Sequence, residues 1–276
     1  MTTTSHPTFD QLLAFAHRLA DRSAAVILPH FRKAMVVVDK SSSIERGGLA
    51  GAAFDPVTAA DRAAERIIRD ELRKAFPDHG IVGEEFDNEV SGSRYQWLID
   101  PIDGTRSFIM GMPVWGTLIA LTDNGKPVLG LMDQPFTGER FWSAAGRTYC
   151  RHRHEAPHML TTRSCPALDQ AILSTTHPDL FAAGFEAERF QALKTQARMT
   201  RYGGDCYAYC MLAMGGIDLI VEAGLKPYDI AALVPIIERA GGRVTGWDGQ
   251  PAIGSARIVA AGDPRLHAQV LNSLAG

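Results

Sequence analysis

Apolar residues recur at helical spacing in two stretches near the start of the chain. The first stretch follows a capping box formed by Thr8 and Gln11, and its apolar stripe comprises Leu12, Phe15, Leu19, Val26 and Ile27. The second follows Thr58, a suitable N-cap residue, and its apolar face comprises Ile67, Ile68, Leu72, Ala75 and Phe76. We therefore expect two amphipathic helices in this part of the chain, the second of which ends at Pro77.

In the first half of the chain, short apolar runs separated by turn residues predict β-strands. They comprise residues 36–38, 97–99, 114–121, 128–132 and 139–143. Asn124-Gly125 lies between two of these runs and is typical of a β-hairpin turn. Residues 150–158 are basic and rich in histidine, and we expect them on the surface between two halves of the molecule.

Strand-like and helix-like patterns alternate in the second part of the chain. Strands are expected at 171–174, 217–221 and 257–261, and helices at 187–195, 205–214, 230–240 and after Asp263-Pro264. Such alternation predicts a layered α/β architecture. We expect residues 1–276 to form one unit in two halves, an α+β half at 1–150 and an α/β half at 151–276.

Composition limits the function classes without selecting one. The 276 residues carry a formal net charge of −3, which gives no basic field for nucleic acid or an anionic membrane. No run approaches the ~18 apolar residues of a membrane span, and residues 1–10 lack the features of a signal peptide. Four cysteines are too few for a disulfide framework, and Cys206 and Cys210 are expected to pack on one helix face. These features favour a reduced, cytoplasmic protein with no membrane or nucleic-acid partner.

The segment Asp100-Pro101-Ile102-Asp103-Gly104-Thr105 directly follows a hydrophobic strand. Pro101 has no N–H and fixes its own φ, so the chain turns there and can bring Asp100 and Asp103 together. Two carboxylates about 4 Å apart repel by roughly 4 kcal/mol at an effective dielectric of 20. A hard cation such as Mg²⁺, Mn²⁺ or Ca²⁺ removes this repulsion. The alternative is a turn in which both aspartates cap the following helix.

In two further segments, acidic residues also lie where a strand ends or a helix begins. Glu84 and Glu85 end a short apolar strand, and Asp229 lies in the first turn of a helix. Each of them alone is typical of surface charge or of helix capping. The three acidic segments together favour one shared cation site.

These segments resemble the signature of the inositol monophosphatase family of metal-dependent phosphatases. The matching motifs are Gly83-Glu84-Glu85, Asp100-Pro101-Ile102-Asp103-Gly104-Thr105 and Tyr228-Asp229-Ile230-Ala231-Ala232. The resemblance implies the five-layer α-β-α-β-α sandwich of the inositol monophosphatase and fructose-bisphosphatase type, assembled as a homodimer. It also implies a phosphomonoesterase that acts on a small phosphorylated metabolite with two or three Mg²⁺ ions, for which Mn²⁺ can substitute.

The resemblance further implies a role for each matching position. The metal ligands would be Glu84, Asp100, Ile102 through its carbonyl, Asp103, Asp229 and, for a third ion, Asp61. Thr105 and Asp61 would orient the attacking water, so these two residues and Glu84 are expected to be catalytic. The N–H groups of Gly104 and Thr105 would cradle the phosphate.

Tyr228 stands where the family usually has tryptophan, and together with the segment 204–209 it resembles the histidinol-phosphate phosphatase branch. The expected substrate is then L-histidinol phosphate, in histidine biosynthesis, with Asp205 and Glu222 binding its cationic leaving group. Asp205 is also placed to cap a helix. One alternative is an inositol-1-phosphate or broad sugar-phosphate monophosphatase with the same metal site. Another is a non-catalytic regulator that binds a phosphorylated ligand or a metal.

Two other features give further hypotheses. Residues 40–55 are rich in serine and glycine and are expected to form a loop, in which Lys40 could approach the third ion site or the phosphate, although a lysine in such a loop is usually solvated. His152, His154 and His158 could bind a transition metal, although such runs are usually exposed.

Overall fold

The computed structural model describes residues 7–34, 36–39 and 56–275, and within these it contains two large sheets. The seven-stranded sheet has its strands in chain order: β3 (Gly80–Gly83), β4 (Tyr95–Asp103), β5 (Gly116–Asp123), β6 (Lys126–Gln134), β7 (Glu139–Ala144), β8 (Arg147–His152) and β9 (His158–Leu160). β3 and β4 are parallel and the other neighbours are antiparallel.

The five-stranded sheet has the order β11-β10-β12-β14-β13. Its strands are β10 (Ile172–Thr175), β11 (Met199–Tyr202), β12 (Leu219–Ala223), β13 (Arg243–Gly246) and β14 (Arg257–Ala261). β10 is parallel to both β11 and β12, whereas β14 is antiparallel to its two neighbours. A separate short pair joins β1 (Val37–Asp39) to β2 (Pro56–Thr58).

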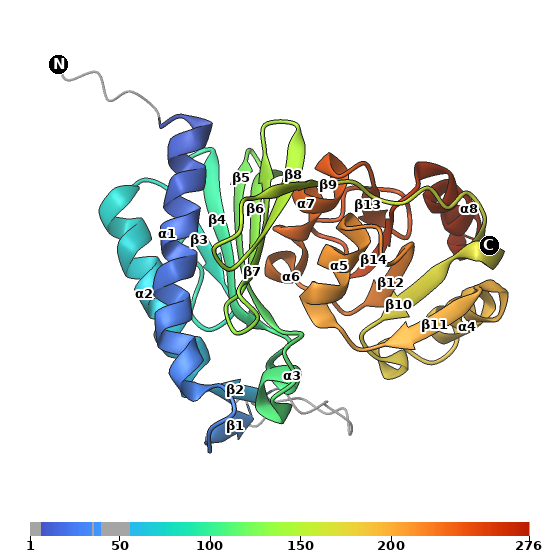
Figure 1. The fold of residues 1–276 in the computed structure, drawn as a ribbon, viewed down its shortest axis with the longest axis horizontal. Helices are drawn as coiled ribbons and strands as arrows, with labels where there is room; N and C mark the ends of the chain where they lie inside the picture. The colour runs from blue at the N-terminus through green and yellow to red at the C-terminus, as the bar shows by residue number, and fades with distance from the viewer. Residues whose placement is uncertain (1–6, 35, 40–55, 276) are drawn as a thin grey trace.

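Helices cover both sheets and fill the space between them (Figure 1). α1 (Phe9–Ile27) and α2 (Ala59–Ala75) pack on the outer face of the seven-stranded sheet through a shared apolar cluster. α5 (Asp205–Ala213) and α7 (Leu233–Arg239) lie between the two sheets within a second cluster. α4 (Phe185–Gln196) and α8 (Pro264–Ala275) cover the outer face of the five-stranded sheet. This is the predicted five-layer α-β-α-β-α sandwich.

Shorter helices complete the described chain. They are α3 (Thr105–Met110), α6 (Pro227–Ile230) and the 3₁₀ segments η1 (Leu28–His30), η3 (Leu168–Gln170) and η4 (Pro178–Leu180). The predicted helix at 230–240 is therefore divided between the end of α6 and α7.

Several local predictions are confirmed. The capping box of α1 is present, with Gln11 N–H donating to Thr8 Oγ1 (3.3 Å) and Thr8 N–H donating to Gln11 Oε1 (2.8 Å). Asn124 and Gly125 both have positive φ, 48° and 76°, and join β5 to β6 in the predicted hairpin. All four cysteines are buried and free, so Cys206 and Cys210 pack in the core as expected.

Residues 153–158 are exposed, as expected for this segment. Its two ends were not predicted as strands: Cys150 is buried in β8 and pairs with His158 of β9 at the edge of the seven-stranded sheet. The predicted boundary at residue 150 thus falls inside β8, and the division at 1–150 and 151–276 stays a prediction. Residues 40–55, with Lys40, lie outside the described residues. No helix in the described part of the chain is long and apolar enough to cross a membrane, and the cytoplasmic location stays a prediction.

Candidate metal centre and active site

A β-bulge at the end of β4 brings Asp100 and Asp103 to one side of the sheet. Residues three apart in a regular strand point to opposite faces, and the register between β4 and β5 shifts between these two aspartates. The N–H of Ile102 donates to Asp100 Oδ1 (3.0 Å), and Thr117 Oγ1 donates to the carbonyl of Pro101 (2.7 Å). A turn closed by the Asp100 carboxylate therefore exists, and it brings the two carboxylates together. Neither aspartate caps α3 as the alternative prediction had it, because the N-cap of α3 is Gly104 and receives no side-chain hydrogen bond.

Asp229 joins them from the first turn of α6. The N–H of Lys226 donates to Asp229 Oδ2 (2.7 Å), which fixes this carboxylate at the helix N-terminus. One oxygen from each of Asp100, Asp103 and Asp229 lies within 4.8 Å of the others. No other group of three carboxylate, histidine or cysteine side chains converges in this way among the described residues, so the three histidines of 152–158 do not form a metal group there.

Burial makes this carboxylate cluster unfavourable in the ionised state. The pKa of Asp100, which is 2% exposed, is raised well above its ordinary value by burial and by the charges of Glu84, Asp103 and Asp229. Burial and neighbouring carboxylates raise the pKa of Asp103 in the same way, and burial raises that of Asp229 to about 7. Oxygen donors in such a cluster fit a hard divalent cation, which would stabilise all three charges together.

Glu84 and Asp61 extend the cluster from two other elements. Glu84 follows β3, which is the parallel neighbour of β4, and its charge raises the pKa of both Asp100 and Asp61. Asp61 Oδ2 accepts hydrogen bonds from the N–H (2.9 Å) and the Oγ1 (2.5 Å) of Thr58, which completes the capping box of α2. Its Oδ1 is buried and accepts no hydrogen bond from any described residue, and burial raises the Asp61 pKa to about 6. Such an oxygen is free to face a cation or a water.

Gly104 and Thr105 lie where β4 passes into α3. Gly104 has φ of 82°, and a Cβ there would lie 2.9 Å from side-chain atoms of Asp205. Glycine is therefore required on both conformational and steric grounds. Thr105 Oγ1 donates to the carbonyl of Ile102 (3.1 Å). This hydrogen bond links Thr105, a predicted phosphate-binding residue, to Ile102, whose carbonyl is a predicted metal ligand.

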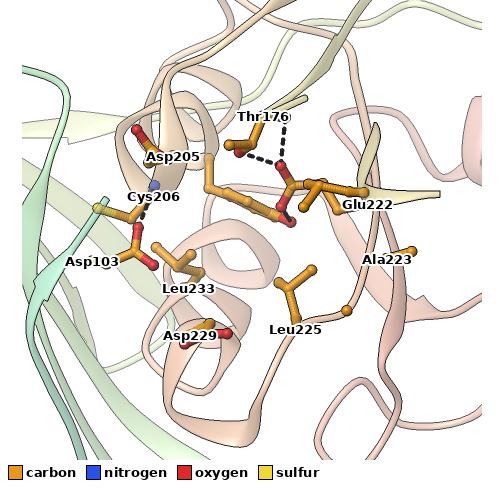
Figure 2. Close-up of a pocket in the computed structure, with 12 residues that line it drawn as sticks. Asp103, Thr176, Asp205, Cys206, Glu222, Ala223, Leu225, Asp229 and Leu233 are labelled. Atoms are coloured by element: carbon orange, nitrogen blue, oxygen red, sulfur yellow. Dashed lines mark hydrogen bonds between the residues drawn. The ribbon is translucent and has the colours of Figure 1, made fainter. Parts of the chain in front are cut away.

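A cavity of about 160 Å³ opens beside the acidic cluster (Figure 2). The charged side chains among its described lining residues are all acidic: Asp103, Asp205, Glu222 and Asp229. A larger cavity of about 590 Å³ shares Asp205 and Asp229 with it and also includes Gly104, Thr105 and Arg106. The structure thus brings the predicted metal, phosphate and substrate residues to one connected region.

Glu222 is held by residues that the sequence did not identify. Thr176 donates to Glu222 Oε1 through its N–H (2.8 Å) and its Oγ1 (2.5 Å), and Tyr209 Oη donates to Oε2 (2.7 Å) (Figure 2). Burial raises the pKa of Glu222, while these hydrogen bonds act in the opposite direction. Tyr209 ends the segment 204–209 that resembles the histidinol-phosphate phosphatase branch, although no role was predicted for it, and Thr176 belongs to no segment that the sequence singled out.

Asp205 begins α5 but does not cap it with its side chain. The N-cap residue is Gly204, and Asp205 has a positive φ of 42°. Asp205 Oδ2 accepts a hydrogen bond from Ser107 Oγ (2.6 Å) across the cleft. The next residue, Cys206, donates its N–H to Asp103 Oδ2 (2.7 Å), so the start of α5 is bonded to both α3 and the acidic cluster.

Known proteins share both the sequence and the fold of this chain. The sequence model of the inositol monophosphatase family matches residues 9–275. The chain is 43% identical to the chloroplastic bifunctional phosphatase IMPL2 of Arabidopsis thaliana, over 98% of this chain and 77% of that protein. It is 35% identical to a histidinol-phosphatase of Mycobacterium tuberculosis, over 96% and 97% of the two chains. A solved structure of an inositol monophosphatase from Zymomonas mobilis is 40% identical, with a TM-score of 0.83, and covers 98% of this chain and 100% of that chain.

Proposed function

The chain belongs to the inositol monophosphatase family of phosphoric monoester hydrolases, and we propose that it hydrolyses L-histidinol phosphate to L-histidinol and phosphate. One observation carries this substrate assignment. The lining of the cavity beside the metal centre includes two carboxylates that are not assigned to the metal, Asp205 and Glu222, and no basic side chain among the described residues. Because the leaving group of histidinol phosphate carries an ammonium, such a lining favours it over a neutral polyol. The relatives named histidinol-phosphatase support the same assignment.

The metal centre in this proposal uses the residues of the acidic cluster. Mg²⁺ would be held by Glu84, Asp100, the carbonyl of Ile102, Asp103 and Asp229, with Asp61 at a third position. Bound there, Mg²⁺ neutralises phosphate oxygens and lowers the pKa of a coordinated water. The number of ions stays a prediction.

The other site residues hold and orient the reacting groups. The N–H groups of Gly104 and Thr105 are proposed to bind the phosphate, and the fixed turn around Ile102 keeps them in place. Thr105 and the free oxygen of Asp61 are proposed to orient the attacking water. Asp205 and Glu222 are proposed to bind the ammonium of the leaving group, with Thr176 and Tyr209 holding Glu222 in position.

The decisive test compares two substrates that differ only in the amino group. We expect L-histidinol phosphate to be hydrolysed with a higher kcat/KM than its analogue that lacks the amino group, in the presence of Mg²⁺. Glu222→Gln removes a charge-assisted interaction of about 1.5–3 kcal/mol, so it should reduce this preference by roughly 10- to 100-fold and leave the analogue nearly unaffected. Equal kcat/KM for the two substrates in the wild-type protein would contradict the assignment.

Hydrolysis of inositol 1-phosphate or of sugar phosphates is the second candidate function. The observation that favours it is the larger cavity of about 590 Å³, whose lining also includes Arg106 and the hydrogen-bonding side chains of Ser107 and Thr176. Carboxylates such as Asp205 can also accept hydrogen bonds from hydroxyl groups. A higher kcat/KM for inositol 1-phosphate than for L-histidinol phosphate would select this alternative. Assembly as a homodimer stays a separate prediction, tested by light scattering.

A further inference from the structure

A buried ion pair on α2 contacts the loop that carries Glu84. Arg69 Nε donates to Glu65 Oε1 (2.7 Å), and the two side chains are 2% and 0% exposed. Removing two charges from water costs several kcal/mol, and an apolar pair of similar volume is often at least as stable. Stability alone therefore does not explain why this pair is buried here.

The loop after β3 supplies the remaining partners of Arg69. The chain turns after β3 and returns to it, where Ile81 and Glu89 exchange two backbone hydrogen bonds (3.0 and 2.8 Å). Inside this turn, Arg69 donates to the carbonyls of Phe86 (3.1 Å) and Asp87 (3.0 Å) and to Glu89 Oε1 (2.8 Å). The guanidinium thus fixes the returning half of the loop to α2.

Glu65 fixes the residues on either side of Glu84. Its Oε2 accepts the N–H of Glu85 (2.8 Å), and a Cβ on Gly83 would lie only 2.0 Å from its Oε1. Residues 83 and 85 are therefore both held against α2. Glu84 lies between them, and because Gly83 pairs with Ile99 in the parallel ladder of β3 and β4, Glu84 lies beside Asp100 where the two strands end.

We propose that Glu65 and Arg69 are positioning residues that set the metal affinity of the centre by holding Glu84. This inference rests on the proposed role of Glu84 as a metal ligand. Groups that orient metal ligands without touching the metal typically change affinity by 10–100-fold. Because Asp61 lies one turn before Glu65 on the same helix, α2 would place both acids relative to Asp100.

Binding of Mn²⁺ to the metal-free protein, followed by electron paramagnetic resonance of the free ion, tests the proposal without turnover. Arg69→Met should weaken Mn²⁺ binding by about 10- to 100-fold. Arg69→Lys keeps the charge but loses the planar fork, so it should weaken binding less. The Mg²⁺ concentration for half-maximal activity should rise in the same order, while kcat at saturating Mg²⁺ returns towards the wild-type value.

Arg140→Met is the matched control. The side chain of Arg140 is 7% exposed, and it donates to Asp133 Oδ1 and Asp21 Oδ1 (2.7 Å each), neither of which is a proposed metal ligand. This variant should lose thermal stability and keep its Mn²⁺ affinity. Equal affinity in Arg69→Met and the wild type, or equal weakening in Arg69→Met and Arg140→Met, would overturn the proposal.

Two further variants keep the test interpretable. Glu84→Gln should weaken Mn²⁺ binding, and an unchanged affinity in this variant would overturn the ligand role of Glu84 and hence the proposed metal centre. If Arg69→Met does not fold, the Mn²⁺ affinities of Arg69→Lys and Glu89→Gln are compared with those of the wild type and Arg140→Met instead. Of the two carboxylates that Arg69 contacts, Glu89 is the more exposed, with 37% of its side chain accessible against 0% for Glu65, so its replacement should perturb folding less.

Discussion

Asp103 shows at the scale of one residue why the acidic cluster fits a divalent cation. Burial and the charges of Asp229 and Asp205 raise its pKa, while the N–H of Cys206 donates to its Oδ2. One neutral hydrogen-bond donor stabilises a carboxylate by much less than a divalent cation does. In the proposed metal centre, the negative charge of Asp103 would therefore matter more than the shape of its side chain.

Asp103→Asn keeps this shape and removes the charge. We expect kcat to fall by more than ~100-fold, because even residues that only orient metal ligands account for 10–100-fold. Phosphate release measured at increasing Mg²⁺ checks the prediction. Asp123→Asn, at a surface carboxylate paired with Arg94, is the control and should retain activity. Full activity in Asp103→Asn would rule out the metal site proposed here.

At the scale of elements, Gly130 permits the close contact between β6 and the segment that leads into α7. A Cβ on Gly130 would lie 1.9 Å from the carbonyl oxygen of Ala232 and 2.8 Å from Pro235 Cγ. No side chain fits between these two backbones, so the sheet and the helix layer meet directly at this point. The contact helps to place α6, which carries Asp229, against the end of β4.

Gly130→Ala should therefore destabilise the protein. Overpacking of this kind costs about 1–3 kcal/mol of the free energy of unfolding, which urea denaturation measures. Gly92→Ala is the control, since a Cβ at Gly92 would have no atom within 4 Å, and it should change the midpoint very little. Equal midpoints for the two variants would mean that the contact at Gly130 relaxes without cost.

At the scale of the whole molecule, a net charge of −3 conceals an uneven distribution. Carboxylates from α2, β4, α6 and the loop after β3 meet at one place, with Asp205 and Glu222 nearby. Arginines such as Arg69 and Arg140 are buried elsewhere in ion pairs. The molecule therefore has a locally anionic centre despite its balanced total.

This centre predicts how stability depends on pH and on metal. Burial raises the pKa of Asp61 to about 6 and of Asp229 to about 7 from an ordinary 3.8, so the folded protein holds these protons more tightly than the unfolded chain does. Without metal, their contribution to stability is complete below the ordinary pKa and is lost as the pH rises towards about 7. Because cations bind the deprotonated carboxylates, Mg²⁺ should raise Tm more at about pH 8 than at about pH 5.

Thermal unfolding in EDTA and in excess Mg²⁺, at several pH values, measures this effect. Asp229→Asn should reduce both the pH dependence of the metal-free protein and the shift produced by Mg²⁺. The same Mg²⁺-induced shift at every pH would contradict the prediction.

Local signals located most of the described helices and strands. The capping residues Thr8 and Thr58 begin helices as predicted, and the strand at Arg257–Ala261 has its predicted bounds. Five of the described strands were not predicted. β2 and β9 are only three residues long, β11 and β13 lie at the two edges of the five-stranded sheet, and β8 overlaps the basic segment 150–158 that was expected on the surface. An edge strand is stabilised by hydrogen bonds to one neighbouring strand, and local sequence patterns do not show which strand that is.

The sequence by itself indicated the chemistry of the site. Asp100, Asp103 and Asp229 stand out because they are carboxylates located where a strand ends or a helix begins. Tertiary structure decided their convergence, because three side chains from distant segments come within 4.8 Å only after β4, α6 and the two sheets have packed. It also decided the partners of Glu84 and Glu222, such as Arg69, Thr176 and Tyr209. Arg69 and Thr176 lie outside the quoted motifs, and Tyr209 lies in one without a predicted role. The contacts of all three depend on burial and distance, which exist only in the folded chain.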